Sequence, residues 1–190
     1  GEGFSAFMVD GKNNPFNLVL SIEKERRAHQ TLELRSFFRQ FKDNPPKEYY
    51  RYLQNPSHEA RKKLFQQFPA KALKAQSEAR CLELGKDNDQ IHQYIKQSLG
   101  VTDRWVLIGG PPCQAYSLVG RSRLQSQTTP KTLEQSGLYK HYLEVLARHS
   151  PPVFIMENVK GILSAANDGK NIFRKILDDL KNPEHVLAGE

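Results

Sequence analysis

Short apolar runs alternate with segments of helical periodicity along the chain. The runs at residues 17–23, 105–109 and 153–156 are rich in Val, Ile, Leu and aromatic side chains, which favours buried strands. Apolar residues recur at helical spacing over residues 138–149 and again over 173–180, and prolines follow both segments. Strands that alternate with helices predict an α/β fold with parallel strand pairing. The apolar face of the first of these helices is expected to consist of Leu138, Tyr142, Leu143, Val145 and Leu146.

Residues 31–98 differ from the rest of the chain because they are polar, rich in Lys, Arg and Gln, and mostly helical in pattern. Prolines divide this pattern near residues 44–46 and 55–56. We interpret the segment as a helical insertion. An aromatic and basic cluster in it is formed by Tyr49, Tyr50, Arg51 and Tyr52. This cluster is suited to stacking on nucleic acid, but packing of a helix onto the sheet is the favoured explanation.

A thiol and a carboxyl follow two of the predicted strands. Cys113 comes after the strand at 105–109 and a Gly/Pro turn, and Glu157 comes directly after the strand at 153–156. Ligands of open α/β sheets bind outside the carboxyl ends of the strands, so both groups should face one crevice. A cysteine beside an acid suggests covalent chemistry on an electrophilic ring or carbonyl. The alternatives are a small buried apolar side chain for Cys113 and a capping or surface acid for Glu157.

Two further segments carry candidate binding residues. Glu23 ends the first predicted strand, and a carboxylate at that place can accept hydrogen bonds from both hydroxyls of a ribose. Residues 117–136 lack apolar periodicity and contain Arg121 and Arg123, which predicts a mobile loop beside Cys113.

The pairing of Pro-Pro-Cys-Gln at residues 111–114 with Glu-Asn-Val at residues 157–159 resembles the cytosine-C5 DNA methyltransferases. The resemblance implies a Rossmann-like S-adenosylmethionine-dependent methyltransferase sheet, here with a helical insertion at about 31–98. It also implies that Cys113 is the nucleophile and that Glu157 binds the target cytosine, which must be flipped out of double-stranded DNA. S-adenosyl-L-methionine is the implied methyl donor.

The same resemblance assigns roles to other residues between about Gly3 and Leu180. The residues expected to bind the cofactor are Glu23, Gly110, Pro112 and Leu138, with an adenine contact near residues 84–87. The residues expected to bind the substrate are Ser117, Arg121, Arg123 and Asn158, the arginines through DNA phosphates. A solvated basic loop is the alternative for the arginines.

Several parts of the family pattern are not visible, including the Phe-x-Gly-x-Gly-Gly loop, the downstream Gln-x-Arg-x-Arg strand and the target-recognition domain. We therefore expect residues 1–190 to be a partial catalytic domain.

Composition and charge narrow the remaining choices. A net charge of +7 favours a polyanionic partner. The two cysteines lie in different contexts, so no disulfide or zinc site is predicted, and Cys81 falls in a helical pattern that favours burial as a small apolar side chain. The apolar stretches are too short for a membrane helix.

We expect a bacterial, cytoplasmic modification enzyme, with a cognate restriction endonuclease as a functional partner. An RNA cytosine methyltransferase and a non-catalytic nucleic-acid-binding remnant are the alternatives.

Overall fold

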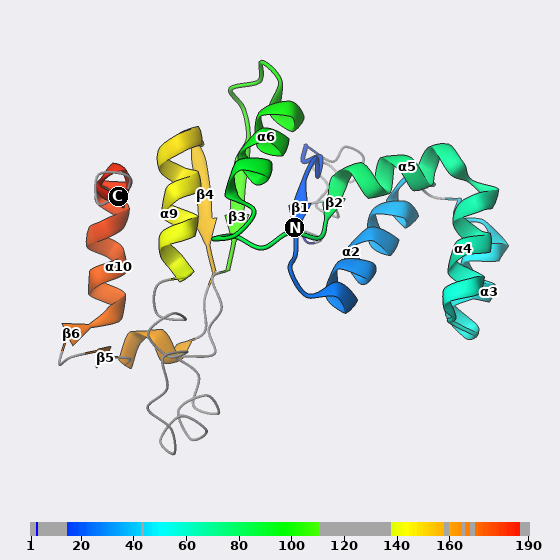
Figure 1. Ribbon diagram of the computed structural model, residues 1–190, viewed down its shortest axis with the longest axis horizontal. Coiled ribbons are helices and arrows are strands. Elements are labelled where there is room, and N and C mark those ends of the chain that lie inside the picture. Colours follow the sequence, from blue (N-terminus) through cyan, green and yellow to red (C-terminus); the bar gives the residue numbers. More distant parts are fainter. Residues whose placement is uncertain are drawn as a thin grey trace. The chain divides into compact units, whose positions relative to one another are not determined.

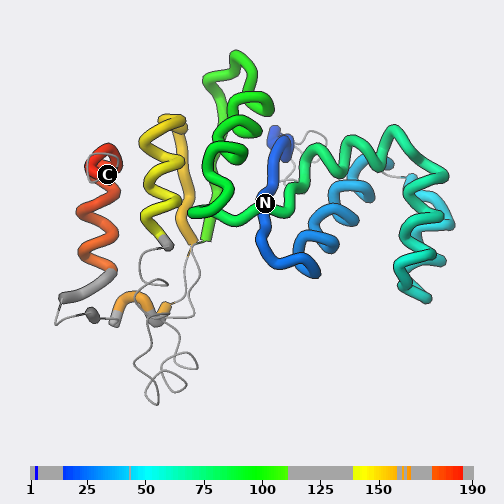
Figure 2. Tube along the Cα trace, viewed as in Figure 1, coloured from blue at the N-terminus to red at the C-terminus, as the bar shows by residue number. Residues whose placement is uncertain are grey.

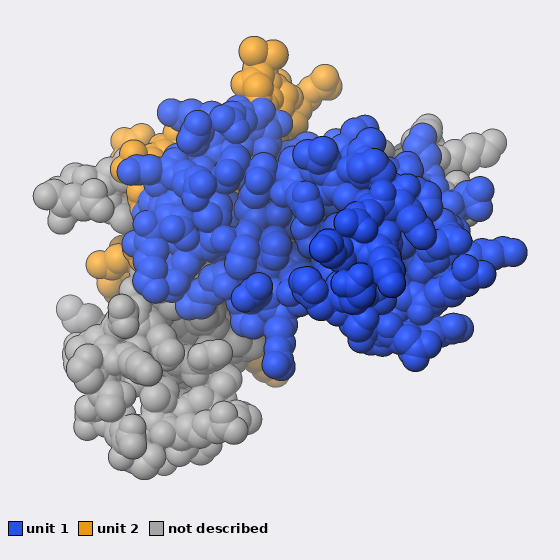
Figure 3. Space-filling model, turned by 45° about the vertical axis from the view of Figure 1, so that its right-hand side comes forward, with its two compact units in different colours: residues 1–98 blue, residues 99–190 orange. Residues whose placement is uncertain are grey.

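Two units make up the chain, residues 1–98 and residues 99–190, which we call unit 1 and unit 2 (Figure 3). The computed structural model describes residues 3, 15–42, 44–110, 138–157, 160–164, 166–167 and 170–186, and Figure 2 follows their Cα trace. Both units combine helices with short paired strands, so the fold is α/β, as the sequence predicts. None of the helices in these described ranges has the length and apolarity needed to cross a membrane.

Unit 1 is mainly helical (Figure 1). Its elements are β1 (Ser21–Ile22), α2 (Arg26–Arg39), α3 (Lys47–Gln54), α4 (His58–Gln67), α5 (Pro69–Glu78), β2 (Ala79–Arg80) and α6 (Asn88–Leu99). Local sequence sets the helix starts: the Glu25 side chain accepts a hydrogen bond from Ala28 N at 2.6 Å, and Ser57 Oγ accepts one from Ala60 N at 3.1 Å. Pro69 occupies the first turn of α5, where its missing N–H costs nothing. The predicted breaks near residues 44–46 and 55–56 are confirmed.

The core of unit 1 is an aromatic cluster between helices. Phe37 is fully buried, and its ring stacks on Phe65 with the centroids 4.7 Å apart. Tyr49 is buried with its ring centroid 4.9 Å from that of Phe38. The sequence correctly favoured packing over an exposed stack for Tyr49, but the expected partner was wrong, because this tyrosine packs against a helix and not against a sheet. Tyr50 is 49% exposed.

The strand pair of unit 1 corrects two sequence predictions. Only Ser21 and Ile22 of the strand expected over residues 17–23 form a strand, and they pair in parallel with Ala79 and Arg80. Cys81 was expected in a buried helical position, but it lies after β2 and is exposed. The reason is tertiary: α5 ends at Glu78, and the next residues extend to pair with β1. This pairing outweighs their helical propensity.

Unit 2 is built on a pair of parallel strands (Figure 1). Its elements after α6 are β3 (Val106–Gly109), α9 (Leu138–His149), β4 (Val153–Met156), the 3₁₀ helix η1 (Lys160–Ser164), β5 (Ala166–Asn167), β6 (Lys170–Asn171), α10 (Ile172–Lys181) and the 3₁₀ helix η2 (Pro183–Val186). The structure confirms the predicted strands at 105–109 and 153–156 and both predicted helices. The small antiparallel pair β5–β6 was not predicted.

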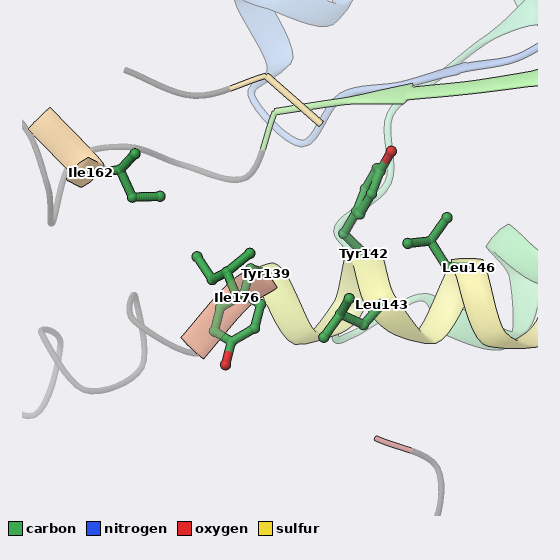
Figure 4. Close-up of a cluster of buried hydrophobic side chains, with 6 residues drawn as sticks. All are labelled: Tyr139, Tyr142, Leu143, Leu146, Ile162 and Ile176. Atoms are coloured by element: carbon green, nitrogen blue, oxygen red, sulfur yellow. The ribbon is translucent and has the colours of Figure 1, made fainter. Parts of the chain in front are cut away.

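The core of unit 2 lies along α9 (Figure 4). Its buried side chains are Tyr139, Tyr142, Leu143, Leu146, Ile162 and Ile176. Leu107 of β3 and Met156 of β4 pack against this cluster, so α9 covers part of the strand pair. Tyr139 Oη donates a hydrogen bond to Asp179 Oδ2 at 2.6 Å, which ties α9 to α10. The apolar face predicted for α9 is confirmed at Tyr142, Leu143, Val145 and Leu146, all of which are buried.

Candidate active site

The carboxyl ends of β3 and β4 lie side by side. The parallel register pairs Gly109 with Met156, and the backbone N–H of Glu157 donates to Gly109 O at 2.9 Å, one residue beyond the end of β4. The predicted pairing of these two strands is therefore confirmed. Gly110 and Glu157 are the first residues after the paired strands, and both leave the same edge of the pair.

The Glu157 carboxyl lies against the backbone of Gly110. A Cβ atom on residue 110 would stand 2.5 Å from Glu157 Cδ, closer than such atoms approach in real structures, and 3.0 Å from its Cγ. Glycine at this position therefore leaves the carboxyl where it lies, whereas a Cβ would turn this flexible side chain aside. The Glu157 residue itself is exposed, so its carboxyl can reach a ligand in solvent.

Tyr142 supports the same strand ends from α9. A Cβ atom on Gly109 would stand 2.8 Å from Cδ2 of the Tyr142 ring, so the backbone of β3 packs directly on the aromatic ring. The hydroxyl of Tyr142 donates to Ile155 O at 3.1 Å, which connects the ring to β4 as well. Burial raises the pKa of Tyr142 to about 12, so the hydroxyl still donates at alkaline pH values at which an exposed tyrosine would already ionise. The helical periodicity predicted Tyr142 only as part of an apolar face.

Most of the other predicted site residues of this region lie outside the described residues: Pro112, Cys113, Ser117, Arg121, Arg123 and Asn158. Leu138 is the first residue of α9, but its side chain is likewise outside the described part of the structure. Of the predicted catalytic pair, the structure therefore places Glu157. The role of Cys113 stays a prediction.

Glu23 lies at the carboxyl end of β1, as expected of the acid that was assigned to a ribose. Its backbone N–H donates to Arg80 O at 3.1 Å and so continues the pairing of β1 with β2. Its Oε1 accepts a hydrogen bond from Glu25 N at 2.8 Å, just before α2 begins. The side chain is thus held at the junction of a strand and a helix, the position at which nucleotide-binding α/β folds place a ribose-binding acid.

A second acid, Glu83, follows β2 at the same edge and was not among the predicted site residues. Lys24 Nζ lies 3.3 Å from Glu83 Oε1, and Lys86 Nζ lies 2.8 Å from Glu83 Oε2. Hydrogen bonds from Lys86 and then Lys24 lower the pKa of the Glu83 carboxyl. The sequence does contain an acid shortly after Ala79 and Arg80. It was not recognised as an acid that follows a strand, because the sequence of those two residues favours a helix.

The model of the C-5 cytosine-specific DNA methylase family matches residues 78–185, more than half of the chain, including β3, β4 and the segment between them. This chain belongs to that family. The resemblance drawn from Pro-Pro-Cys-Gln and Glu-Asn-Val is therefore confirmed for the family as a whole.

Curated relatives extend the comparison. The chain is 32% identical over 192 residues to a type II methyltransferase, M.Bpa9945I of Bacillus paralicheniformis, covering 92% of this chain and 42% of the relative. It is 37% identical over 82 residues to M.BsuFI of Bacillus subtilis, covering 43% of this chain and 18% of the relative. It is 37% identical over 81 residues to the DNA (cytosine-5-)-methyltransferase M.ApeKI of Aeropyrum pernix, covering 43% of this chain and 16% of the relative.

The chain spans less than half the length of these curated relatives. No solved structure matches it.

Proposed function

We propose that the methylase transfers a methyl group from S-adenosylmethionine to C5 of cytosine in double-stranded DNA. Family membership supports the reaction class. The observation that carries the proposal is the place of the Glu157 carboxyl, which lies against Gly110 at the paired ends of β3 and β4. Gly110 precedes Cys113 by three residues. An acid is therefore present at the edge of the strand pair from which the cysteine segment departs.

Chain connectivity limits how far Cys113 can lie from this carboxyl. Three residues span at most about 11 Å when fully extended, at about 3.6 Å per residue. This limit is compatible with a Cys113 thiol and a Glu157 carboxyl that act on the same pyrimidine ring, which is what we propose. A cysteine and an acid on either side of a base are what covalent activation of cytosine requires.

The proposed chemistry starts from the thiolate of Cys113. Its sulfur forms a bond to C6 of cytosine, and the electron pair displaced from the C5–C6 double bond makes C5 nucleophilic. Glu157 would accept a hydrogen bond from the cytosine amino group and share a proton with N3, offsetting the negative charge that develops on the ring. After C5 has gained the methyl group, loss of the C5 proton and of the thiolate restores the aromatic ring and the enzyme.

S-adenosylmethionine would supply the methyl group on an electrophilic sulfonium. One described residue suits the ribose of such a ligand. Glu23 follows β1 beside the start of α2, where a carboxylate can bind the ribose hydroxyls. As the family resemblance implies, we propose Gly110, Pro112 and Leu138 as further cofactor-binding residues, and Ser117, Arg121, Arg123 and Asn158 as DNA-binding residues. Cytosine C6 is inaccessible inside a duplex, so the base must be flipped out.

The setting that we propose is bacterial modification. Two of the relatives named above are type II methyltransferases, which supports a modification enzyme acting in the cytoplasm beside a cognate restriction endonuclease. The Rossmann-like sheet order belongs to this proposal as well.

Covalent trapping tests the proposal. The full-length protein is incubated with S-adenosylmethionine and a duplex containing 5-fluorocytosine, whose fluorine cannot leave as the C5 proton does, so the adduct should survive denaturation. Cys113→Ala should abolish the adduct, whereas Cys81→Ala, the same change at the other cysteine of the chain, should leave it intact. No adduct in the wild-type protein, or an adduct that survives Cys113→Ala, would contradict the proposal.

A further inference from the structure

The net positive charge of the chain is concentrated in the helices of unit 1. Residues 31–78 contain ten Lys and Arg against five Asp and Glu, and so carry five of the seven net positive charges in about a quarter of the chain. Four of the acids are already paired within this segment: Glu33 with Arg61, Glu48 with Arg51, Glu59 with Lys63, and Glu78 with Arg39. Lys62 and Lys74 are exposed lysines of the same segment.

A groove of about 440 Å³ in unit 1 is lined by some of these basic side chains, including Arg61 and Lys62. It lies between α4 and α5, which are separated by the single residue Phe68, and we call it the α4–α5 groove. Its polar walls include His58, Lys62 and Gln66 from α4 and Gln76 from α5. Phe65 and Leu73 give it an apolar part, and Leu73 is 67% exposed there.

Among the described residues that line the groove, Glu33 is the one acidic side chain, and an ion pair with a neighbouring arginine neutralises its charge. Arg61 forms an ion pair with Glu33, donates to Gln30 O at 2.9 Å and lies over the Phe65 ring at 4.7 Å from its centroid. The other polar side chains that line the groove are Lys62, His58, Gln66 and Gln76. They are donors or cations, which suits an anion, and the apolar part suits a sugar.

We propose that the α4–α5 groove binds the sugar-phosphate backbone of the DNA duplex that the methylase modifies. Phosphate oxygens accept hydrogen bonds from lysine, glutamine and histidine side chains, and such contacts fix the position of a protein on a duplex without reading its sequence. The inference rests on the proposed function, since duplex DNA is taken as the substrate. It adds a DNA-binding surface in the helical segment, which the sequence alone marks as an insertion without an assigned role.

The salt dependence of DNA binding tests the groove. Removing one phosphate interaction reduces the slope of log K against log salt concentration by about 0.9. In the full-length protein, Lys62→Gln should lower this slope by about that amount and weaken binding equally for all duplex sequences. Lys63→Gln is the matched control, because Lys63 is the next residue, is 69% exposed, pairs with Glu59 at 3.9 Å and does not line the groove. It should leave the slope unchanged.

A second variant tests the groove without removing a lysine. Leu73→Glu adds a negative charge at an exposed groove position and should weaken duplex binding further than Lys62→Gln does. Both variants should keep the helical circular dichroism of the wild-type protein, because neither side chain belongs to the aromatic core.

The outcomes separate this inference from the proposed function. If wild type traps 5-fluorocytosine DNA but Lys62→Gln and Lys63→Gln have equal salt slopes, the groove assignment is overturned and the methylase reaction stands. If wild type neither binds nor traps duplex DNA, both fail. If Lys62→Gln and Leu73→Glu weaken binding of a structured RNA and leave duplex binding intact, the occupant is RNA and the assignment to DNA is wrong.

Discussion

Phe37 in unit 1 and Glu157 in unit 2 occupy opposite environments. Phe37 is fully buried among aromatic rings contributed by three helical regions, whereas Glu157 is exposed directly after a strand whose own residues Phe154 and Ile155 are 40% and 38% exposed. The first environment is held together by the area of its apolar contacts. The second depends on two glycines that let a ring and a carboxyl approach the backbone. Stability and proposed chemistry therefore rest on different residue types in the two units.

The largest effect expected is on the stability of unit 1. Phe37→Ala should lower the free energy of unfolding by about 3 to 5 kcal/mol, because it removes a fully buried ring and leaves a cavity. Denaturant titration followed by circular dichroism measures it. Tyr50→Ala, at a side chain that is 49% exposed and meets the Tyr49 ring edge-on, is the control and should lower the same free energy by only about 1 kcal/mol. Equal losses in the two variants would contradict the assignment of the core.

A Cβ atom at Gly110 should affect catalysis more than folding. Gly110→Ala must displace the Glu157 carboxyl, and a misplacement of about 1 Å can lower a rate about 100-fold. The measurement is kcat for methyl transfer to duplex DNA, with the unfolding midpoint recorded in parallel. Gly100→Ala is the contrasting variant: Gly100 has a φ of +56° and no neighbour within 4 Å of an added Cβ. It should lose stability through backbone strain while keeping the wild-type kcat.

The hydroxyl of Tyr142 should make a smaller contribution that depends on pH. Tyr142→Phe removes the hydrogen bond to Ile155 O and should lower the free energy of unfolding by about 1 kcal/mol at neutral pH. The folded state raises the pKa of this phenol to about 12, above the usual value of about 10. The native state therefore holds the proton more tightly, and this contribution is complete below about pH 10 and is lost as the pH rises towards 12.

Comparing unfolding of the wild-type protein and Tyr142→Phe between about pH 8 and pH 12 isolates this contribution from those of the other tyrosines and the lysines. The stability difference between the two proteins should shrink over the upper part of this range. A difference that stays constant throughout would show that the Tyr142 phenol titrates normally and that the ring is not buried as described.

The smallest effect is expected at the surface of α10. Lys181 Nζ lies 2.7 Å from Asp178 Oδ1 and lowers the pKa of that exposed carboxyl. Lys181→Ala should raise the Asp178 pKa towards its ordinary value, as measured by NMR titration, without a detectable change in the unfolding midpoint, because solvent screens exposed ion pairs. Lys175→Ala, whose partner is Asp179, should leave the Asp178 pKa in place.

Prediction from the sequence succeeded where local pattern and local chemistry agree. The strands at β3 and β4 and the helices α9 and α10 were predicted because apolar spacing matched the period of each element and prolines marked the ends. Prediction failed at β2, where two residues that follow a helix extend because β1, far earlier in the chain, offers them a pairing partner, as the register of Ile22 with Arg80 shows. Because β2 was not predicted, the burial expected for Cys81 was wrong, and Glu83 was not recognised as an acid that follows a strand.

The sequence by itself determined the family, through Pro-Pro-Cys-Gln and Glu-Asn-Val, and the order of most elements, because both depend on residues close together in the chain. Only the tertiary structure decided that Tyr49 packs on a helix, that Tyr142 supports both strands, and that Gly110 makes room for Glu157. Each of these is a contact between segments that are separated in the sequence. Its geometry follows from strand register and helix packing, so the spacing of apolar residues along the chain does not reveal it.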